Sequence, residues 1–500
     1  MGLAKLYSRA LCGIQAPEVI VEVHVANGLP NFSIVGLPDT EVKESRDRVR
    51  SAIQMSGFDF PARRITVNLA PADLPKDSGR YDLPIAIGVL LASGLIKTTL
   101  DISQFEFAGE LALDGMLRKI NGALAIAYNA GESLRGFILP ETSAVEAQLV
   151  SGVTIYAAKS LIQVVQYLTG EIILVKAAGI DSLATLTADS FLDFNQVKGQ
   201  LSVKNALEIA AAGRHSILMV GSPGCGKSML AERMVTILPP LTSKEAIESA
   251  SIYSLSQGGM DLNLWGRIPF RQPHHSSSGV AIVGGGAKPK PGEISLAHNG
   301  VLFMDEIPEF ERKVLEVLRE PLETRKINIA RASQKVEFPA DFQLVAAMNP
   351  CPCGNYAHPQ NVCKCSAEQR NKYVSKLSAP LLDRIDLVVQ MPYLKPEDLQ
   401  NLPLGESSQE IKARVIGVRK LQLDRQNKLN YALNNQEIEK YCNLEEKALE
   451  LLQQISNKLG YSPRSYYRLL KIGRTIADLD NAEIIKAKHI AQGIQYKQLL

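Results

Sequence analysis

The chain has 500 residues, of which 46% are hydrophobic and 21% are charged, and its formal net charge is +3. This composition is typical of a soluble globular protein of about two or three domains, since single hydrophobic cores rarely extend beyond roughly 250–300 residues. A net charge near zero excludes a global attraction to nucleic acid, so any contact with a polyanion requires a local basic patch. No apolar run approaches the roughly 18–20 residues that span a bilayer, and the first residues lack the apolar core of a signal peptide. We therefore expect a cytoplasmic protein with no membrane contact.

Residues 1–170 alternate strand-like and helix-like runs, which predicts an α/β or α+β domain. The strand-like runs are VIVEVHV (19–25), RITVNLA (64–70), FEFAGELAL (105–113) and GFILP (136–140). The helix-like runs are EVKESRDRVRSAIQMSG (41–57), DLPIAIGVLLASG (82–94) and GALAIAYNAGESL (122–134). Residues 171–200 show no sustained period and are predicted to be a linker.

Residues 201–395 form a second predicted α/β segment. Its short apolar strands are HSILMV (215–220), GVLFMDEI (300–307) and FQLVAAMN (342–349). From 396 to 500 the strand signals fade, and polar stretches with helical spacing predict a terminal helical domain.

The strongest motif is GSPGCGKS (221–228), which matches G-x-x-x-x-G-K-[ST] between a strand and a helical run. Its glycines let backbone N–H groups face phosphate oxygens, and the following helix start favours negative charge. We expect Lys227 to reach the β- and γ-phosphates of ATP and Ser228 to ligate Mg²⁺, whereas Cys225 is interpreted as structural. The residues predicted to bind nucleotide and Mg²⁺ are Gly221, Ser222, Pro223, Gly224, Cys225, Gly226, Lys227, Ser228 and Asp305.

Polar residues at the ends of two further strands complete a candidate hydrolysis site. Asp305 can hold Mg²⁺ through water, while Glu306 can polarise the attacking water. Asn349 is suited to orienting that water, with an ordinary strand-end cap as the alternative. Arg384 and Arg464 are candidates for an arginine that an adjacent subunit supplies to the γ-phosphate, which accelerates hydrolysis roughly a thousandfold or more. For either arginine alone, a surface salt bridge is the alternative.

Four of the seven cysteines lie in CPCGNYAHPQNVCKC (351–365). Cytosolic thiols stay reduced, which argues against disulfides and favours metal ligation as the explanation. The four thiolates of Cys351, Cys353, Cys363 and Cys365 suffice for a closed tetrahedral zinc site of structural type. His358 is an alternative ligand, and reduced structural cysteines without metal are the alternative to the site itself.

Together these motifs resemble those of the AAA+ ATPases. More narrowly, RQPHHSSSGVAIVGGGAKPKPGEISLAHNGVLFMDEIPEF (271–310) is similar to the magnesium-chelatase-related ComM/YifB group, and the similarity covers nearly the whole chain. The resemblance implies a P-loop AAA+ α/β core, a C-terminal helical lid and a hexameric ring with ATP between subunits. It assigns Lys227 and Ser228 to Walker A, Asp305 and Glu306 to Walker B, Asn349 to sensor 1, Arg384 to the arginine finger and Arg464 to sensor 2.

Residues 1–170 look similar to the Lon-protease-type domain, which has an α/β fold like domain 2 of ribosomal protein S5. The similarity runs through residues 71–88 and 107–140. A Lon-type protease needs a serine nucleophile paired with a lysine. This chain has Arg80, Tyr81 and Asp82 around the expected nucleophile and Leu124 at the expected lysine. We therefore predict a domain without protease activity that serves assembly or polynucleotide contact.

Two inserts in the AAA+ segment point to the substrate of the ring. VGGGAKPKPGE (283–293) is a glycine-rich basic loop suited to tracking phosphates in a central pore, and INIARASQKVEFPADF (327–342) predicts a β-hairpin. The basic residues predicted to contact DNA are Lys288, Lys290, Arg331 and Lys335. Solvated loops with ordinary lysines are the alternative. The adjacent His274 and His275 face opposite ways on a strand and are assigned to a loop in the pore or the subunit interface rather than to one shared metal ion.

Two functions of different classes follow. The first is an ATP-driven motor on single-stranded or branched DNA; the resemblance implies branch migration of recombination intermediates during natural transformation. With one Trp in the chain, stacking platforms are sparse, which favours backbone tracking over base recognition. The second is the ATPase subunit of a magnesium-chelatase-like metal-insertion complex, against which the Lon-like domain and the cysteine cluster argue. A ring-shaped scaffold is a weaker third alternative.

Overall fold

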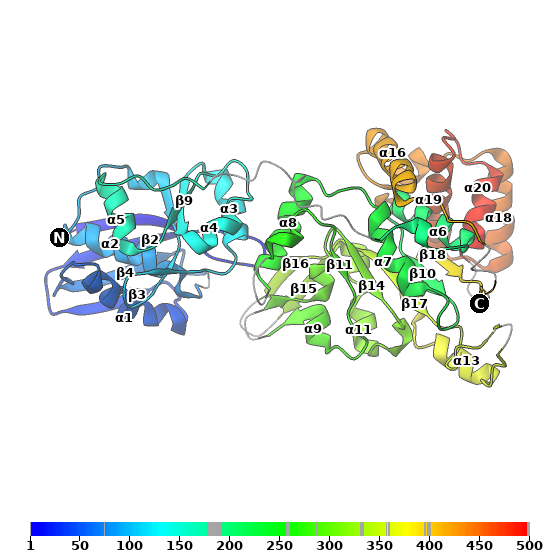
Figure 1. Cartoon of the computed structure of the whole chain (residues 1–500), viewed down its shortest axis with the longest axis horizontal. Helices are drawn as coiled ribbons and strands as arrows, with labels where there is room; N and C mark the ends of the chain where they lie inside the picture. Colours follow the sequence, from blue (N-terminus) through cyan, green and yellow to red (C-terminus); the bar gives the residue numbers. More distant parts are fainter. Residues whose placement is uncertain are drawn as a thin grey trace. The chain divides into compact units, whose positions relative to one another are not determined.

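The computed structural model describes every residue except Met1, Pro75, 178–191, 257–260, 287–288, 331–334, 357, 359–360, 395–396, 398–401 and 498–500. The chain divides into two compact units, Met1–Leu186 with Thr242–Gly266 and Thr187–Leu241 with Arg267–Leu500 (Figure 1). Residues 242–266, which the sequence assigned to the 201–395 segment, therefore belong to the first unit. The boundaries predicted at 170, 200 and 395 stay predictions, and 14 of the 30 residues of the predicted linker lie outside the described residues. In the part of the chain that is described, no helix combines the length and apolarity needed to cross a bilayer.

The first unit contains a seven-stranded mixed sheet. In sheet order its strands are β3 (Asn31–Val35), β4 (Arg64–Ala70), β2 (Glu18–Ala26), β1 (Gly2–Arg9), β5 (Phe105–Phe107), β8 (Gly136–Pro140) and β9 (Ile155–Ala158). The β1–β2 and β2–β4 pairs are antiparallel, and the other four pairs are parallel. The alternation along β2 buries Val19, Val21, Val23 and Val25 on one face of the sheet. The four predicted strand regions are confirmed, with the run 105–113 divided between β5 and the short β6 (Glu110–Leu111), which pairs with β7 (Leu117–Arg118).

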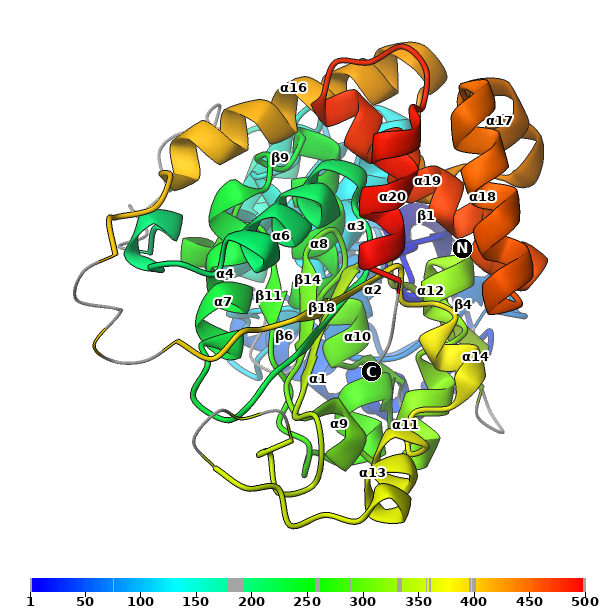
Figure 2. The ribbon, with the colours of Figure 1, turned by 90° about the vertical axis from the view of Figure 1, so that its right-hand side faces the viewer.

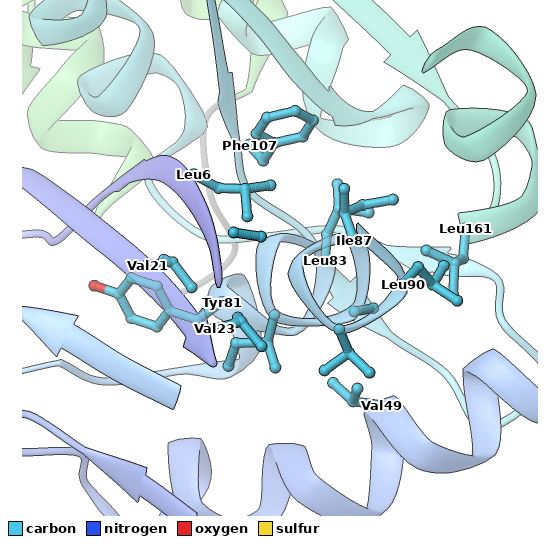
Figure 3. Close-up of a cluster of buried hydrophobic side chains, with 14 of the residues drawn as sticks. Leu6, Val21, Val23, Val49, Tyr81, Leu83, Ile87, Leu90, Phe107 and Leu161 are labelled. Atoms are coloured by element: carbon cyan, nitrogen blue, oxygen red, sulfur yellow. The ribbon is translucent and has the colours of Figure 1, made fainter. Parts of the chain in front are cut away.

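Helices of the first unit include the three that the sequence predicted. They are α1 (Thr40–Met55), α2 (Asp82–Ser93), α3 (Ala123–Ala130), α4 (Glu141–Ala147), α5 (Leu161–Thr169) and α8 (Ser243–Ser254). Nearly all of α2 is buried, because it packs among Leu6 of β1, Val49 of α1 and the other core side chains of Figure 3. Its apolar residues therefore cover every side instead of one stripe.

Asp82 begins α2 at the position where the Lon resemblance places the nucleophile region. Its carboxylate accepts hydrogen bonds from Arg48 Nε at 2.7 Å, from the backbone N–H of Leu111 at 3.1 Å and from the Ser45 hydroxyl. These bonds satisfy a fully buried carboxylate and connect α1 to α2.

The second unit contains a five-stranded parallel sheet. In sheet order its strands are β11 (Phe270–Arg271), β14 (Val301–Met304), β17 (Gln343–Met348), β10 (Ile217–Val220) and β18 (Leu387–Gln390). Every residue of β10, β14 and β17 is buried, which explains their continuous apolar runs. Because all five strands run the same way, the segments that follow β10, β14 and β17 meet at one edge of the sheet.

Helices and two small hairpins surround this sheet. The helices are α6 (Leu201–Gly213), α7 (Lys227–Ile237), α9 (Gly279–Val283), α10 (Glu293–Leu296), α11 (Arg312–Val317), α12 (Pro321–Thr324), α13 (Ala367–Val374) and α14 (Ala379–Leu382). The predicted hairpin in 327–342 is confirmed as β15 (Lys326–Ala330) paired antiparallel with β16 (Lys335–Pro339). In the glycine-rich insert, β12 (Gly284–Gly285) pairs with β13 (Lys290–Pro291).

The C-terminal part is helical, as predicted. Its helices are α16 (Ser408–Gln426), α17 (Asn435–Tyr441), α18 (Glu446–Leu459), α19 (Pro463–Leu479) and α20 (Ala487–Gln495). Figure 2 shows α16 and α19 near α6, and Val415 of α16 and Ile476 of α19 join the core around the parallel sheet. The remaining apolar faces of α17 to α20 form a second cluster of their own.

Candidate nucleotide and metal sites

The phosphate loop connects β10 to α7 at the carboxyl edge of the sheet. Gly224 and Gly226 have φ angles of +76° and +94°, a left-handed conformation that glycine adopts without a Cβ penalty. These angles turn the loop so that α7 begins at Lys227, and a helix start of this kind presents unpaired N–H groups to an anion. Cys225 is half-buried, and burial raises the pKa of its thiol, as expected for a structural cysteine.

Lys227 connects the phosphate loop to the neighbouring strand β17. Its Nζ donates to the carbonyl oxygens of Gly221 at 2.7 Å and Ser222 at 3.0 Å, and to Asn349 Oδ1 at 3.1 Å. The ammonium group is thus held at the carboxyl end of β17, within reach of the loop that would contain the phosphates. Lys227 follows β10 and Asn349 follows the neighbouring strand β17, so the structure brings the two side chains together.

Ser228 and Asp305 form the oxygen pair of the site. The Ser228 hydroxyl donates to Asp305 Oδ2 at 2.8 Å, so the first turn of α7 meets the end of β14 across β17. Hydroxyl and carboxylate oxygens are ligands that Mg²⁺ prefers, and metal sites of this kind are completed by water and substrate phosphates. The residues present therefore fit the predicted magnesium site.

Glu306 follows Asp305 with a φ of +50° and a half-exposed side chain. Its Oε2 lies 3.6 Å from His275 Nδ1, and the His275 ring lies 4.2 Å, centroid to centroid, from that of His274. The prediction that the two histidines face opposite ways on a strand is wrong, because they follow β11 in a turn where their rings meet. The sequence also did not predict the contact between His275 and Glu306. Only the strand order, with β11 beside β14, brings residues 31 positions apart in the chain to one place.

Arg384 lies at the amino ends of the strands of the same sheet, opposite the phosphate loop. Its carbonyl oxygen accepts from the hydroxyl of Ser216, the residue before β10, at 2.9 Å. The strands β10 and β18 are parallel, with Ile217 beside Leu387, so Arg384 is at their amino ends whereas Lys227 follows the carboxyl end. Four strand residues span about 13 Å. Arg384 is therefore separated from the phosphate loop of its own chain by the length of the sheet.

Arg464 lies beside Arg384 because both contact one carboxylate. Arg384 Nη2 is 2.9 Å from Glu323 Oε2, and Arg464 contacts Oε1 of the same glutamate. The structure thus brings the two predicted arginines together with each other and not with Lys227. Glu323, at the end of α12, was not found from the sequence, since nothing in its local pattern indicates a partner.

A basic cavity adjoins Arg464. Its volume is about 610 Å³, and its lining includes Arg325, Arg468 and Lys471. Burial lowers the pKa of Lys471 to about 8, and its Nζ donates to the carbonyl oxygen of Tyr431 at 3.0 Å. Such a cavity suits an anionic group that comes from outside the chain.

The four cysteines of 351–365 converge. One Sγ atom from each of Cys351, Cys353, Cys363 and Cys365 lies within 4.8 Å of the others. A tetrahedral zinc ion with bonds of about 2.3 Å separates its sulfurs by roughly 3.8 Å. The Cys351–Cys353, Cys351–Cys363 and Cys353–Cys363 separations of 3.4, 3.7 and 3.7 Å fit that geometry. The ring of His358 lies 4.3 Å from that of Tyr393, and the sulfur set is complete without it.

The cysteine cluster packs directly on the phosphate loop. Gly354, between the first two cysteines and the second two, has a φ of +76°, and a Cβ there would lie 2.6 Å from Pro223 Cδ. Cys351 is buried two residues after Asn349. The metal candidate and the nucleotide candidate are therefore one continuous structure.

A recess beside this junction has a volume of about 370 Å³. Gly221 and Ser222 line it on the phosphate-loop side, and Tyr356, Met391 and Tyr393 line it elsewhere. The recess therefore adjoins the phosphate loop.

The predicted DNA contacts are only partly described. Lys288 and Arg331 lie outside the described residues, Lys290 is an exposed residue of β13, and Lys335 begins β16. The two inserts lie side by side, because a Cβ at Gly284 would be 2.7 Å from Ile329 Cδ1. Contact between these residues and DNA stays a prediction.

Comparison with known proteins gives matches over almost the whole chain. Residues 193–399 match the family described as magnesium chelatase, subunit ChlI; residues 21–143 match subunit ChlI of Mg-chelatase; and residues 405–497 match magnesium chelatase, subunit ChlI C-terminal. The chain is 49% identical over 503 residues to competence protein ComM of Haemophilus influenzae, covering 100% of this chain and 98% of that protein. It is 46% identical over 500 residues to protein YifB of Escherichia coli, again covering 100% and 98%. A shorter match, 26% identical over 183 residues, covers 32% of this chain and 33% of Lon protease 2 of Bacillus subtilis.

Proposed function

Because the chain belongs to the ComM/YifB family of magnesium-chelatase-type AAA+ proteins, we propose that it is an ATP-driven DNA motor that promotes branch migration of recombination intermediates during natural transformation. The observation that carries the proposal is the division of the hydrolysis site between two edges of one sheet. The phosphate loop and Asp305 lie at the carboxyl edge, whereas Arg384 and Arg464 lie at the amino edge. A site of this kind is complete only where the two edges of neighbouring copies meet, which is a head-to-tail contact that closes into a ring. We propose a hexamer, as the family resemblance implies, and a cytoplasmic location, where ATP and DNA are available.

In the proposed site, the loop N–H groups and Lys227 bind the β- and γ-phosphates. Mg²⁺, held by Ser228 and through water by Asp305, would neutralise phosphate charge. Glu306 polarises the attacking water, and Asn349 orients it. Arg384 and Arg464 of the next copy stabilise the charge that develops on the γ-phosphate.

We propose a structural zinc ion at Cys351, Cys353, Cys363 and Cys365. Four thiolates leave no open coordination position, which excludes a catalytic role for the metal. The contact between Gly354 and Pro223 supports a bracing function, because a fixed cluster then limits the positions available to the phosphate loop. The four cysteine ligands all belong to one chain, and no step of ATP hydrolysis involves the zinc ion.

The first unit is proposed to be a Lon-like domain without protease activity. The ion pair between Arg48 and the buried Asp82 supports the absence of protease activity, because it occupies the region where the resemblance places a serine nucleophile. The helices α16 to α20 are proposed to act as the lid of the AAA+ core, because α19 carries Arg464 and packs on α6.

The alternative is an ATPase subunit of a metal-insertion complex, which the magnesium-chelatase matches favour, including the match of residues 21–143 in the first unit. The two functions differ in what stimulates ATP hydrolysis. For the motor, single-stranded DNA or a labelled four-way junction should raise the ATPase rate of the full-length protein, and ATP should convert the junction into strand-exchange products. An ATPase rate and an oligomeric state that are both unchanged by DNA would instead favour the metal-insertion subunit.

A further inference from the structure

A recess in the first unit combines aromatic rings with arginines. It has a volume of about 480 Å³ and is lined by α1, by the edge strand β3 and by the residues that lead into β4, elements that are adjacent in Figure 1. Its lining includes Phe32, Phe60, Arg46, Arg50 and Arg63. Nothing in the hydrolysis site uses these residues.

The two rings of the recess are held in place by the core. Phe32 and Phe60 pack on the hydrophobic core of the unit and remain partly exposed. Their ring centroids are 6.0 Å apart with an interplanar angle of 30°, and the Arg50 guanidinium carbon lies 5.7 Å from the Phe60 centroid. A platform that is already ordered loses little conformational entropy when another flat group stacks on it.

The rim of the recess is basic. Lys43, Arg46 and Arg50 follow one another at helical spacing along the exposed face of α1. Arg63 and Arg64 are exposed where β4 begins, beside Asn31 of β3. Among side chains that the structure describes, Asp47 pairs with Arg46, and no carboxylate lies within 4.0 Å of Arg50, Arg63 or Arg64. The charge of these three arginines is therefore available to a polyanion.

We propose that this recess binds single-stranded DNA, with a base stacked on Phe60 and the adjoining phosphates on Arg50 and Arg63. The proposal rests on the proposed function and adds a substrate site to it. Aromatic rings beside arginines are the combination with which proteins bind unpaired strands, since bases stack on the rings, whereas the bases of a duplex are inaccessible to a ring. The tryptophan count suggested sparse stacking platforms, but β3–β4 pairing brings together two phenylalanines that are 28 residues apart.

Tryptophan fluorescence tests the stacking directly. The chain has one tryptophan, Trp265, which is 5% exposed, so Phe60→Trp adds an accessible reporter to an otherwise buried signal. In the full-length protein without nucleotide, an oligo-dT strand should quench the fluorescence of Phe60→Trp and leave that of the wild type unchanged. A Phe60→Trp protein that binds oligo-dT without quenching would overturn the assignment.

Affinity measurements separate stacking from phosphate binding. Fluorescence anisotropy would compare a labelled oligo-dT strand with an abasic strand of the same length. Phe60→Leu, which keeps apolar packing, should lower the affinity for the dT strand by about fivefold or more and leave the affinity for the abasic strand unchanged. Arg50→Gln should weaken the binding of both strands, and it should reduce the slope of the logarithm of the binding constant against the logarithm of the salt concentration by about 0.7. Arg118→Gln, which removes an exposed arginine paired with Glu110, is the matched control and should change neither.

The outcomes distinguish this site from the motor. If the wild type binds single-stranded DNA and Phe60→Leu binds both strands as the wild type does, the recess assignment is wrong and the motor stands. If Arg118→Gln weakens binding as much as Arg50→Gln, the effect is one of net charge and the assignment is equally wrong. If the wild type binds neither strand and its ATPase ignores DNA, the proposed function itself fails.

Discussion

Replacing Gly354 by alanine should weaken ATP binding through the phosphate loop. The new Cβ would lie 2.6 Å from Pro223 Cδ, whereas carbon atoms in ordinary contact are about 3.5 Å apart, so the Pro223 ring has to retreat by about 1 Å. Pro223 is part of the loop, and a shift of that size misaligns N–H groups aimed at phosphate. Losing one hydrogen bond to a charged group costs about 1.5–3 kcal/mol, which corresponds to a dissociation constant raised by about 10- to 150-fold.

Gly94→Ala is the matched control for backbone strain. Gly94 has a φ of +74°, close to the +76° of Gly354, and a Cβ there would meet no heavy atom within 4 Å. Both substitutions should therefore share a backbone-strain cost of about 1–2 kcal/mol in the free energy of unfolding, to which Gly354→Ala adds the clash with Pro223. Only Gly354→Ala should change the affinity for a fluorescent ATP analogue with Mg²⁺, titrated at a temperature where both variants are folded.

Zinc content measured on the same samples shows whether the cysteine cluster survives the substitution. A Gly354→Ala protein that retains its metal and binds the ATP analogue within twofold of the wild type would refute the mechanical connection between cluster and loop. Equal weakening by Gly94→Ala would also refute it, because the effect would then come from general destabilisation.

Four further predictions follow from the proposed site. Glu306→Gln should keep ATP affinity and lose turnover, so that ATP stays bound in a filter assay; continued hydrolysis would contradict its role. Arg384→Ala and Lys227→Ala should each be inactive alone, but a mixture should recover part of the ATPase rate. A contact is intact where the loop comes from the Arg384→Ala copy and the arginine from the Lys227→Ala copy, whereas the reverse order lacks both groups. A mixture without activity would argue against a shared site. Removing metal with a chelator, or Cys351→Ser, should lower ATP affinity together with zinc content measured by mass spectrometry, and unchanged affinity would leave the cluster without a bracing function. Burial lowers the pKa of Lys471 from 10.5 to about 8, so the charged form of this lysine destabilises the fold at neutral pH. This penalty disappears as the pH rises from about 8 to 10.5. In denaturant unfolding, Lys471→Met should therefore raise the free energy of unfolding by at most about 3 kcal/mol at pH 7 and by less near pH 10.5.

Local pattern was sufficient for the elements that are buried on all sides or defined by a motif. The strands β10, β14 and β17 are continuous apolar runs, and the glycines of the phosphate loop adopt the conformations that the motif requires. The convergence of the four cysteines could also be predicted, because a short loop is enough to bring the two C-x-C pairs together.

Other features depend on tertiary contacts that no local pattern records. The edge strand β3 has a mixed, half-exposed pattern and was not predicted as a strand. The helix α8 follows the phosphate-loop helix in the chain but packs on α3 of the first unit, where Leu255 approaches Gly122. Its apolar residues indicate that the helix is covered on one face and do not indicate by which element.

The most consequential contact that the sequence did not predict is the convergence of Arg384 and Arg464 on Glu323. Two guanidinium groups held together repel each other, and the shared carboxylate offsets that repulsion in the single chain. On the proposed function, the γ-phosphate of a neighbouring copy carries more charge than Glu323 and would compete for the same arginines. The arginines would then leave Glu323 only where a loaded phosphate loop is presented, so that ATP binding and subunit contact stabilise each other. The single carboxylate of Glu323 compensates only part of the charge of the arginine pair within its own chain. On the proposed function, the completed site is therefore conditional on both a neighbouring copy and nucleotide.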